Sequence, residues 1–190
     1  MPSAKAGTGR KPLKPASAPT GEGSDELSEA GQVLLGTLEQ FLRDDGWPLA
    51  EEDAGDRALA MAVEGNNGRW LCVAQVPPDR DLVLFTSVIP AFVPPERRPR
   101  MAEFVARANF GMLLGAFELE LDDGEVRFCT SVDFTGVDPA PLAASGVLAG
   151  MIRQVVYVNV ANVDRYLPAL MTVLYGDADP AEAVARAEAD

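Results

Sequence analysis

Two tight turns between apolar runs constrain the fold of this chain more than any other feature of its sequence. Gly65-Asn66-Asn67-Gly68 lies between the strand-like segments 59–64 and 69–76, and Asp123-Gly124 lies between two further alternating segments. Both turn sequences suit positive φ angles and are typical of β-hairpins. Because a hairpin joins neighbouring antiparallel strands, we expect an antiparallel sheet.

The first hairpin has a predicted register. Pairing Glu64 with Arg69 places four side chains on one face of the sheet: Met61, Val63, Trp70 and Cys72. A third strand is expected over 81–89. Its segment 82–85 is apolar on both faces, which is typical of a strand that is central or covered on both sides.

The second hairpin also has a predicted register. A two-residue loop at Asp123-Gly124 places Leu121 opposite Val126 and Glu120 opposite Arg127. Glu120 and Arg127 then form a cross-strand ion pair. The opposite face of this hairpin is apolar, and its members are Phe117, Leu119, Leu121, Val126 and Phe128.

Three other segments have helical periodicity. The first helix begins after Ser24 or Asp25 and ends at Asp45-Gly46-Trp47-Pro48, and the second runs from Pro94 to about Met112. A long helix is expected from about 139 to 175, with a kink or restart at Pro168. The predicted fold class is therefore α+β, a five-stranded antiparallel sheet with elements in the order α-βββ-α-ββ-α.

The chain divides into three segments by composition. Residues 1–24 are rich in Pro, Ala, Gly and Lys and are expected to be a disordered basic tail. Residues 25–176 are expected to form a single domain. Residues 177–190 are acidic and rich in Ala, and we expect them to be frayed.

Charge is unevenly distributed between these segments. The chain has a net charge of −13, but residues 1–24 carry four basic groups and one acidic group, a charge of +3. The remainder has 12 basic and 28 acidic residues, a charge of −16, and no lysine. Such a domain repels phosphate backbones and anionic lipids, so we expect neither nucleic acid nor membrane as partner.

Several kinds of catalysis are excluded by missing residue types. The chain has no histidine, so it contains no Ser-His-Asp unit and no histidine metal site. The two cysteines, Cys72 and Cys129, cannot form a Cys-only zinc site. Glu118 and Glu120 lie about 7 Å apart on one strand face, which overlaps the separation in inverting glycosidases. A solvated polar face explains them better, and we expect no enzyme and no cofactor.

A surface for interaction with a protein is predicted near the third strand. If helices cover only one face of the sheet, the apolar residues Phe85, Ile89 and Phe92 form a subunit or partner interface. The alternative is that helices and loops cover both faces. In addition, Arg97, Arg98 and Arg100 oppose the dipole of the second helix and indicate an acidic partner segment, unless they form an ordinary solvated face.

Five short motifs, in order, resemble the YbjN family of bacterial proteins. They are Val88–Pro94, Glu103–Gly111, Leu114–Leu119, Asp123–Phe128 and Asp164–Met171 with Tyr175-Gly176. The resemblance covers about residues 30–176. It implies a regulator of sensory transduction with the fold of type III secretion chaperones, and it implies no reaction.

These observations lead to two expectations about function. The first is a noncatalytic regulator or chaperone-like adaptor that binds a protein, which includes the case of a homodimer. The second is a small-molecule sensor with a pocket between the sheet and the long C-terminal helix. No apolar leader and no apolar run of about 18 residues is present, so we expect the cytoplasm as its location.

Overall fold

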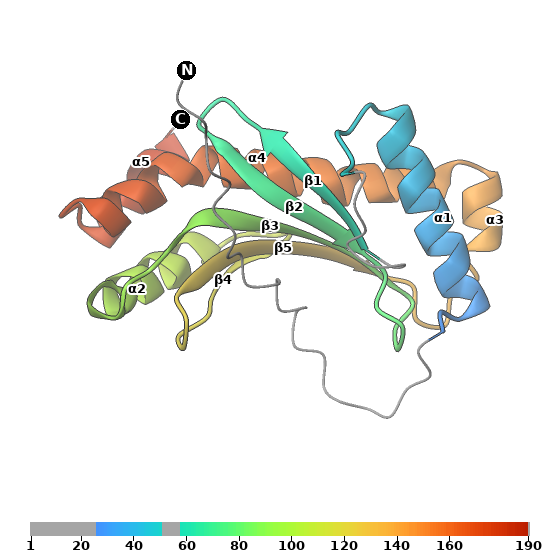
Figure 1. Cartoon of the computed structure of the whole chain (residues 1–190), viewed down its shortest axis with the longest axis horizontal. Coiled ribbons are helices and arrows are strands. Elements are labelled where there is room, and N and C mark those ends of the chain that lie inside the picture. The colour runs from blue at the N-terminus through green and yellow to red at the C-terminus, as the bar shows by residue number, and fades with distance from the viewer. Residues whose placement is uncertain (1–25, 51–57, 190) are drawn as a thin grey trace, which may run out of the picture.

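The computed structural model describes residues 26–50 and 58–189. It has one five-stranded antiparallel sheet, with the strand order β1-β2-β3-β5-β4 (Figure 1). The strands are β1 (Ala58–Glu64), β2 (Arg69–Gln75), β3 (Leu82–Phe92), β4 (Ala116–Leu119) and β5 (Glu125–Asp133). The expected α+β class with its five-stranded antiparallel sheet is confirmed. The expected tail, residues 1–24, lies outside the described residues.

Helices gather on one face of the sheet and at its ends. They are α1 (Glu29–Asp44), the short 3-10 helix η1 (Pro95–Arg97), α2 (Arg98–Asn109), α3 (Ala140–Ala144), α4 (Val147–Tyr175) and α5 (Pro180–Ala189). The long helix α4 packs along β3 and β5 (Figure 1). The core lies between α4 and the sheet, where side chains such as Phe85, Phe128 and Ile152 are fully buried.

The first hairpin has the predicted register, with Glu64 opposite Arg69 and Met61 opposite Cys72. Its turn is held by α4. The Asp164 carboxylate accepts hydrogen bonds from the backbone N–H groups of Asn66 and Asn67, at 3.1 and 2.7 Å. This close approach requires a glycine at position 65, because a Cβ there would collide with the Asp164 carboxylate.

The predicted register of the second hairpin is wrong by two residues. Glu118, not Glu120, lies opposite Arg127, and Leu119 lies opposite Val126. The loop is longer than two residues because the Gly124 N–H donates to the Glu120 carbonyl at 2.8 Å. A shift by two residues keeps each side chain on its face, so the predicted faces of Phe117, Leu119, Val126 and Phe128 remain correct.

The long helix breaks at a different place from the one predicted. Gly146, with φ of +78°, separates α3 from α4, whereas α4 continues through Pro168. Proline removes the N–H that would bond to the carbonyl of Asp164. The Asn67 side chain donates to that carbonyl instead, at 2.9 Å, so the carbonyl still has a hydrogen-bond partner.

Residues 180–189 form α5, so the expected fraying of the C-terminal segment is wrong for them. The physical reason is an apolar side of this helix that is buried against α2 and α4, and it consists of Pro180, Ala183, Val184 and Ala187. The Arg165 guanidinium donates to the carbonyls of Ala187 and Glu188, at 2.6 and 2.7 Å, and so caps the end of α5.

Candidate functional site

The predicted interaction residues of β3 lie on opposite sides of the sheet. Phe85 and Ile89 are 0% and 3% exposed and face the helices, so assigning them to a partner surface is wrong. The reason is strand alternation: the odd-numbered positions of β3 are buried beneath the helices, whereas the even-numbered positions face away. Phe92 is at an even position and is 66% exposed.

The three predicted arginines bind backbone carbonyls of this chain. Arg97 donates to the carbonyl of Gly176 at 2.8 Å, and Arg100 donates to those of Asp177 and Ala178. Arg98 donates to the carbonyls of Val93 and Leu121. Arg97 and Arg100 therefore lie at the negative end of α4, where cations are favourable. Their role in the structure is to hold the segment between α4 and α5.

The sheet face opposite α4 is crossed by none of the helices in the described part of the chain (Figure 1). We call this the open face. Its centre is an apolar strip that follows from the pairing of β1, β2, β3 and β5, and the strip consists of Ala60, Leu71, Val73, Leu84, Thr86, Val88 and Cys129. Apart from Thr86, which is 8% exposed, these side chains are half-buried. The exposed Phe92 lies opposite Glu125 at one end of this face.

Charged residues surround the apolar strip. By their register, five carboxylates belong to the open face, and we call them the acidic rim: Glu64, Glu118, Glu120, Glu125 and Asp133. Two cations, Arg69 and Arg127, share this face. Among these described residues the open face thus has three more carboxylates than guanidinium groups, and Arg98 lies close to Glu120, bonded to the carbonyl of Leu121.

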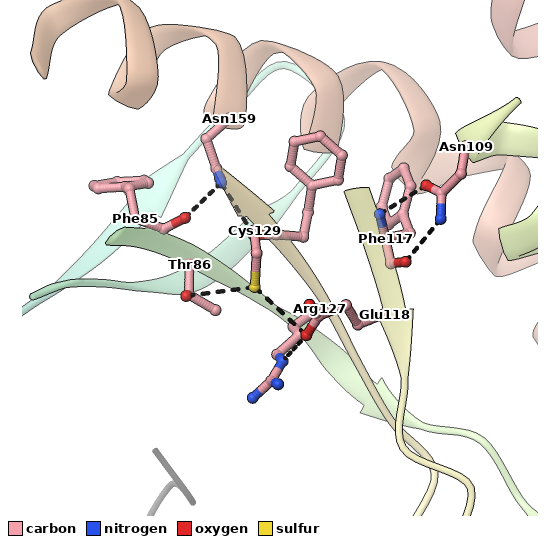
Figure 2. A network of polar contacts seen from close by, with 9 residues as sticks. Phe85, Thr86, Asn109, Phe117, Glu118, Arg127, Cys129 and Asn159 are labelled. Carbon is pink, nitrogen blue, oxygen red and sulfur yellow. Dashed lines mark hydrogen bonds and ion pairs between the residues drawn. The ribbon is translucent and has the colours of Figure 1, made fainter. Parts of the chain in front are cut away.

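A polar cluster lies at the β4 side of the open face (Figure 2). The Arg127 Nε donates to Glu118 at 2.5 Å, and the Cys129 thiol lies 3.7 Å from the same carboxylate oxygen. Burial, and then the charge of Glu118, raises the pKa of Cys129 to about 11. This thiol is therefore protonated at neutral pH and is a poor nucleophile. Burial lowers the pKa of Arg127, but the hydrogen bond and charge of Glu118 outweigh it and raise the pKa overall.

The carboxylate pair Glu118 and Glu120 is committed to structural contacts. Glu118 binds Arg127, and a Glu120 carboxylate oxygen accepts the backbone N–H of Asp122 at 3.2 Å. Neither carboxylate lines any of the three surface hollows described below. The arrangement suits a binding surface better than a hydrolytic site.

A buried polar network fixes the other face of the sheet to α4 (Figure 2). The Asn159 amide donates to the carbonyls of Phe85 and Phe128, at 2.9 and 3.0 Å, and accepts from the Ser87 hydroxyl at 2.6 Å. Thr130 donates to the carbonyl of Val155 on α4 at 2.9 Å. Asn159 thus ties backbone groups of β3 and β5 to α4, and the network makes the sheet a rigid platform.

The outer edge of β4 is closed by a side chain of α2. Asn109 donates to the carbonyl of Phe117 at 2.9 Å and accepts from its N–H at 2.8 Å, as a neighbouring strand would (Figure 2). A partly buried amide needs such partners. With this edge occupied, addition of a partner strand beside Phe117 is disfavoured.

The expected pocket between the sheet and α4 is filled by core side chains. Three open hollows in the described residues lie at the surface instead. One of about 520 Å³ lies between α1 and α4, a second borders the 65–68 turn and α4, and a third lies between α2 and α5. None of them has a set of converging charged groups that identifies a ligand. In the described residues we also find no helix suited to crossing a membrane.

Comparisons with known proteins agree with the sequence motifs. The family model YbjN, described as "Putative bacterial sensory transduction regulator", matches residues 35–170. A solved structure described as "Crystal structure of YbjN, a putative transcription regulator from E. coli" is 18% identical, covers 70% of this chain and 93% of that chain, and has a TM-score of 0.44. No curated protein sequence matches the chain.

Proposed function

This chain belongs to the YbjN family, and from that premise we propose that it is a noncatalytic cytoplasmic regulator that binds a protein partner through the open face. The single observation that carries the proposal is the apolar strip on that face. Soluble proteins that leave a contiguous apolar surface rimmed by polar groups commonly use it for binding. The fold and the acidic rim then set the properties of the partner.

The shape and rigidity of the face support this proposal. The apolar strip spans four neighbouring strands, and the Asn159 network holds the two central ones, β3 and β5, on α4 from behind. A surface that is already ordered loses little entropy when a partner binds. The acidic rim favours a partner segment that combines apolar side chains with positive charge.

The chemistry of the described side chains supports a binding role over catalysis. Burial raises the pKa of both Cys72 and Cys129 to about 11, so neither thiol is an activated nucleophile. The Glu118 and Glu120 carboxylates have structural partners. The adaptor role is therefore proposed for the open face itself and needs no reaction.

Affinity capture tests the proposal. The wild-type protein, a variant with Val73→Glu and Leu84→Glu, and a control with Leu113→Glu are used to capture proteins from the cytoplasm of the source cell, followed by mass spectrometry. Val73 and Leu84 lie at the centre of the open face, whereas Leu113 is 94% exposed in the loop after α2. Thermal melts establish that all three proteins fold.

We expect one protein to be recovered with the wild type and with the Leu113 control, and its recovery to fall at least about tenfold with the open-face variant. Each buried carboxylate would lack a partner in the complex, which disfavours binding. Equal recovery by the folded open-face variant contradicts the proposal, as does the absence of any specifically recovered protein.

A further inference from the structure

We propose that the surface of α2 and α4 on which α5 lies is a docking site for an acidic amphipathic helix of a partner protein, and that α5 occupies this site until such a helix displaces it. The site is separate from the open face, because α4 covers the other side of the sheet (Figure 1). Three observations carry the inference: the charges of α5 and of the surface beneath it, the contacts that hold α5, and a hollow that α5 leaves unfilled.

The surface beneath α5 is basic, although the chain as a whole is acidic. Four guanidinium groups of η1, α2 and α4 contact α5, the segment before it or the hollow beside it, and they belong to Arg97, Arg100, Arg107 and Arg165. The carboxylates of η1 and α2 are those of Glu96 and Glu103, and Glu103 pairs with Arg107. The other charged side chains of these elements bind elsewhere: Arg98 to the second hairpin, Asp164 to the 65–68 turn and Arg153 to Asp45. Four guanidinium groups against two carboxylates leave this surface with a charge of +2.

Helix α5 and the segment before it carry the opposite charge. Residues 176–189 contain four acidic residues and one basic residue, a charge of −3. The Asp177 carboxylate lies 3.3 Å from the Arg97 guanidinium, and the Glu188 carboxylate accepts from the Tyr166 hydroxyl at 3.1 Å. The acidic residues of this segment thus match the arginines beneath it. An acidic helix of another protein would be attracted by the same arginines.

The arginines hold α5 and the segment before it by backbone groups. Arg165 donates to the carbonyls of Ala187 and Glu188 at the end of α5, and Arg97 and Arg100 donate to carbonyls of residues 176–178. Every helix ends in free carbonyls, so Arg165 can cap the end of another helix in the same way. The buried side chains of α5 are small, and they are Pro180, Ala183, Val184 and Ala187. A helix with larger apolar side chains gains more from burial here and can therefore displace α5.

A hollow of about 550 Å³ between α2 and α5 shows where such larger side chains would lie. From α2 and the turn after it, the hollow is lined by Ala106 and by Phe110, which is 89% exposed. From α5 it is lined by Ala181 and Ala185, which lie one helical turn apart. A helix in the place of α5 with large apolar side chains at these two positions would fill the hollow and cover Phe110. The partner helix is therefore expected to be acidic, with two large apolar side chains one turn apart.

Binding of synthetic peptides to the full-length protein tests the inference. Peptide A has the sequence of residues 177–189, and peptide B is peptide A with Ala181→Leu and Ala185→Leu. Peptide C is peptide B with Glu182→Lys and Glu188→Lys, which reverses the charge at two exposed positions. Each peptide carries a fluorophore, and its fluorescence anisotropy is measured as the protein is added.

Three proteins are compared. In the wild type, α5 competes with the peptide. Ala183→Asp places a charge at a position of α5 that is 0% exposed, and it should release α5 from its site. Ala189→Asp adds the same charge at an exposed position of α5 and is the matched control. Thermal melts establish that the domain of each protein is folded.

We expect peptide B to bind Ala183→Asp at least about tenfold more tightly than it binds the wild type or the control, because the released site has no competing helix. Peptide B should bind this variant several-fold more tightly than peptide A does, because its leucines fill the hollow. Peptide C should bind several-fold more weakly than peptide B, because the arginines repel its lysines. Equal binding of peptide B to the three folded proteins, no gain from the leucines, or equal binding of peptides B and C would each overturn the inference.

A second measurement uses only the wild-type protein and decides the case in which Ala183→Asp does not fold. Excess peptide B should accelerate amide hydrogen exchange in residues 183–189 of the protein several-fold, because a displaced helix of ten residues is not stable by itself. The leucines distinguish the peptide from α5 by mass. Unchanged exchange at a concentration of peptide B that saturates binding would show that the peptide binds elsewhere, and it would contradict the inference.

Discussion

Asp164 begins a family motif whose side chains stabilise the fold. Its carboxylate accepts three hydrogen bonds from the 65–68 turn, two from backbone N–H groups and one from the Asn66 side chain. Two residues further on, Tyr166 donates to Glu188 of α5, and Leu167 packs close to Gly68. The motif that begins at Asp164 therefore joins α4 to the first hairpin and to α5, and in this way it stabilises the fold.

Replacing Asp164 by Ala should lower the free energy of unfolding by about 2–3 kcal/mol, because hydrogen bonds to a charged group are each worth more than neutral ones. Urea denaturation measures this loss. Asp122→Ala is the control, since Asp122 is exposed in a turn and its substitution should change stability by no more than about 0.5 kcal/mol. Equal effects of the two substitutions would show that the hydrogen bonds of Asp164 do not contribute to stability.

Asp45 makes part of the stability dependent on pH. The Tyr157 hydroxyl donates to it at 2.7 Å and lowers its pKa most, while burial opposes this; Trp47 and Arg153 lower the pKa further. A carboxyl whose pKa is lowered by folding stabilises the protein fully above its ordinary pKa of 3.8, and this contribution is lost as pH falls through the lowered value.

Asp45→Asn should therefore destabilise the protein at pH 7, and its difference from the wild type should shrink as the pH falls below about 4. Urea denaturation at a series of pH values measures the difference. Asp44→Asn removes a neighbouring exposed charge and serves as the control. A difference for Asp45→Asn that is constant down to pH 2 would be inconsistent with the lowered pKa.

Among the helices, α5 was the one that the sequence analysis missed. This helix is short, and its ten residues are acidic and rich in Ala. Its apolar side is formed mainly by small residues. Such a segment is not stable alone, and its helix depends on packing against α2 and α4. The informative signal lay elsewhere in the chain: Arg165, exposed in a helix, caps the carbonyls of Ala187 and Glu188.

Arg165→Gln should loosen α5 without unfolding the domain. We expect amide hydrogen exchange in residues 183–189 to accelerate about tenfold, which corresponds to the loss of a cap worth about 1–2 kcal/mol. Arg186→Gln is the matched control, because Arg186 is exposed and makes only a long contact of 3.4 Å within α5. Exchange that is already unprotected in the wild type would instead restore the expectation of a frayed segment.

The sheet was more accessible to prediction than the helices because its signals are local. Turns that contain glycine, and the alternation of apolar and polar residues, predict both hairpins and the correct faces. The pairing of Glu64 with Arg69 is one example. The second register failed because the loop closes through Gly124, which contacts Val93 just after the end of β3, about thirty residues earlier in the chain. The continuity of α4 at Pro168 likewise depends on Asn67, about one hundred residues earlier in the chain.

The same distinction applies to the candidate site. The apolar pattern of β3 predicts an apolar sheet face but does not show which alternate residues face the helices, and Phe85 and Ile89 prove to be on the buried side. A strand that is apolar on both faces has no internal signal for this choice. The position of α4 decided the side, and β3 contributes the neighbouring residues Leu84, Thr86 and Val88 to the open face.

At the scale of the whole molecule, charge decides whether two copies meet through the open face. Two copies of the chain, each with a net charge of −13, repel each other most at low ionic strength. We therefore expect a monomer at about 0.02 M NaCl. Any self-association through the apolar strip should appear only as salt rises towards about 0.5 M, because salt screens the repulsion between the copies.

Sedimentation velocity across this range of salt measures the change, and the Val73→Glu and Leu84→Glu variant should stay monomeric throughout. A dimer that is present at low salt and dissociates as salt rises would contradict this ordering. It would mean that opposite charges on the two copies attract each other, since that is the attraction that salt weakens. The direction of the salt dependence thus separates association through the apolar strip from association through opposite charges.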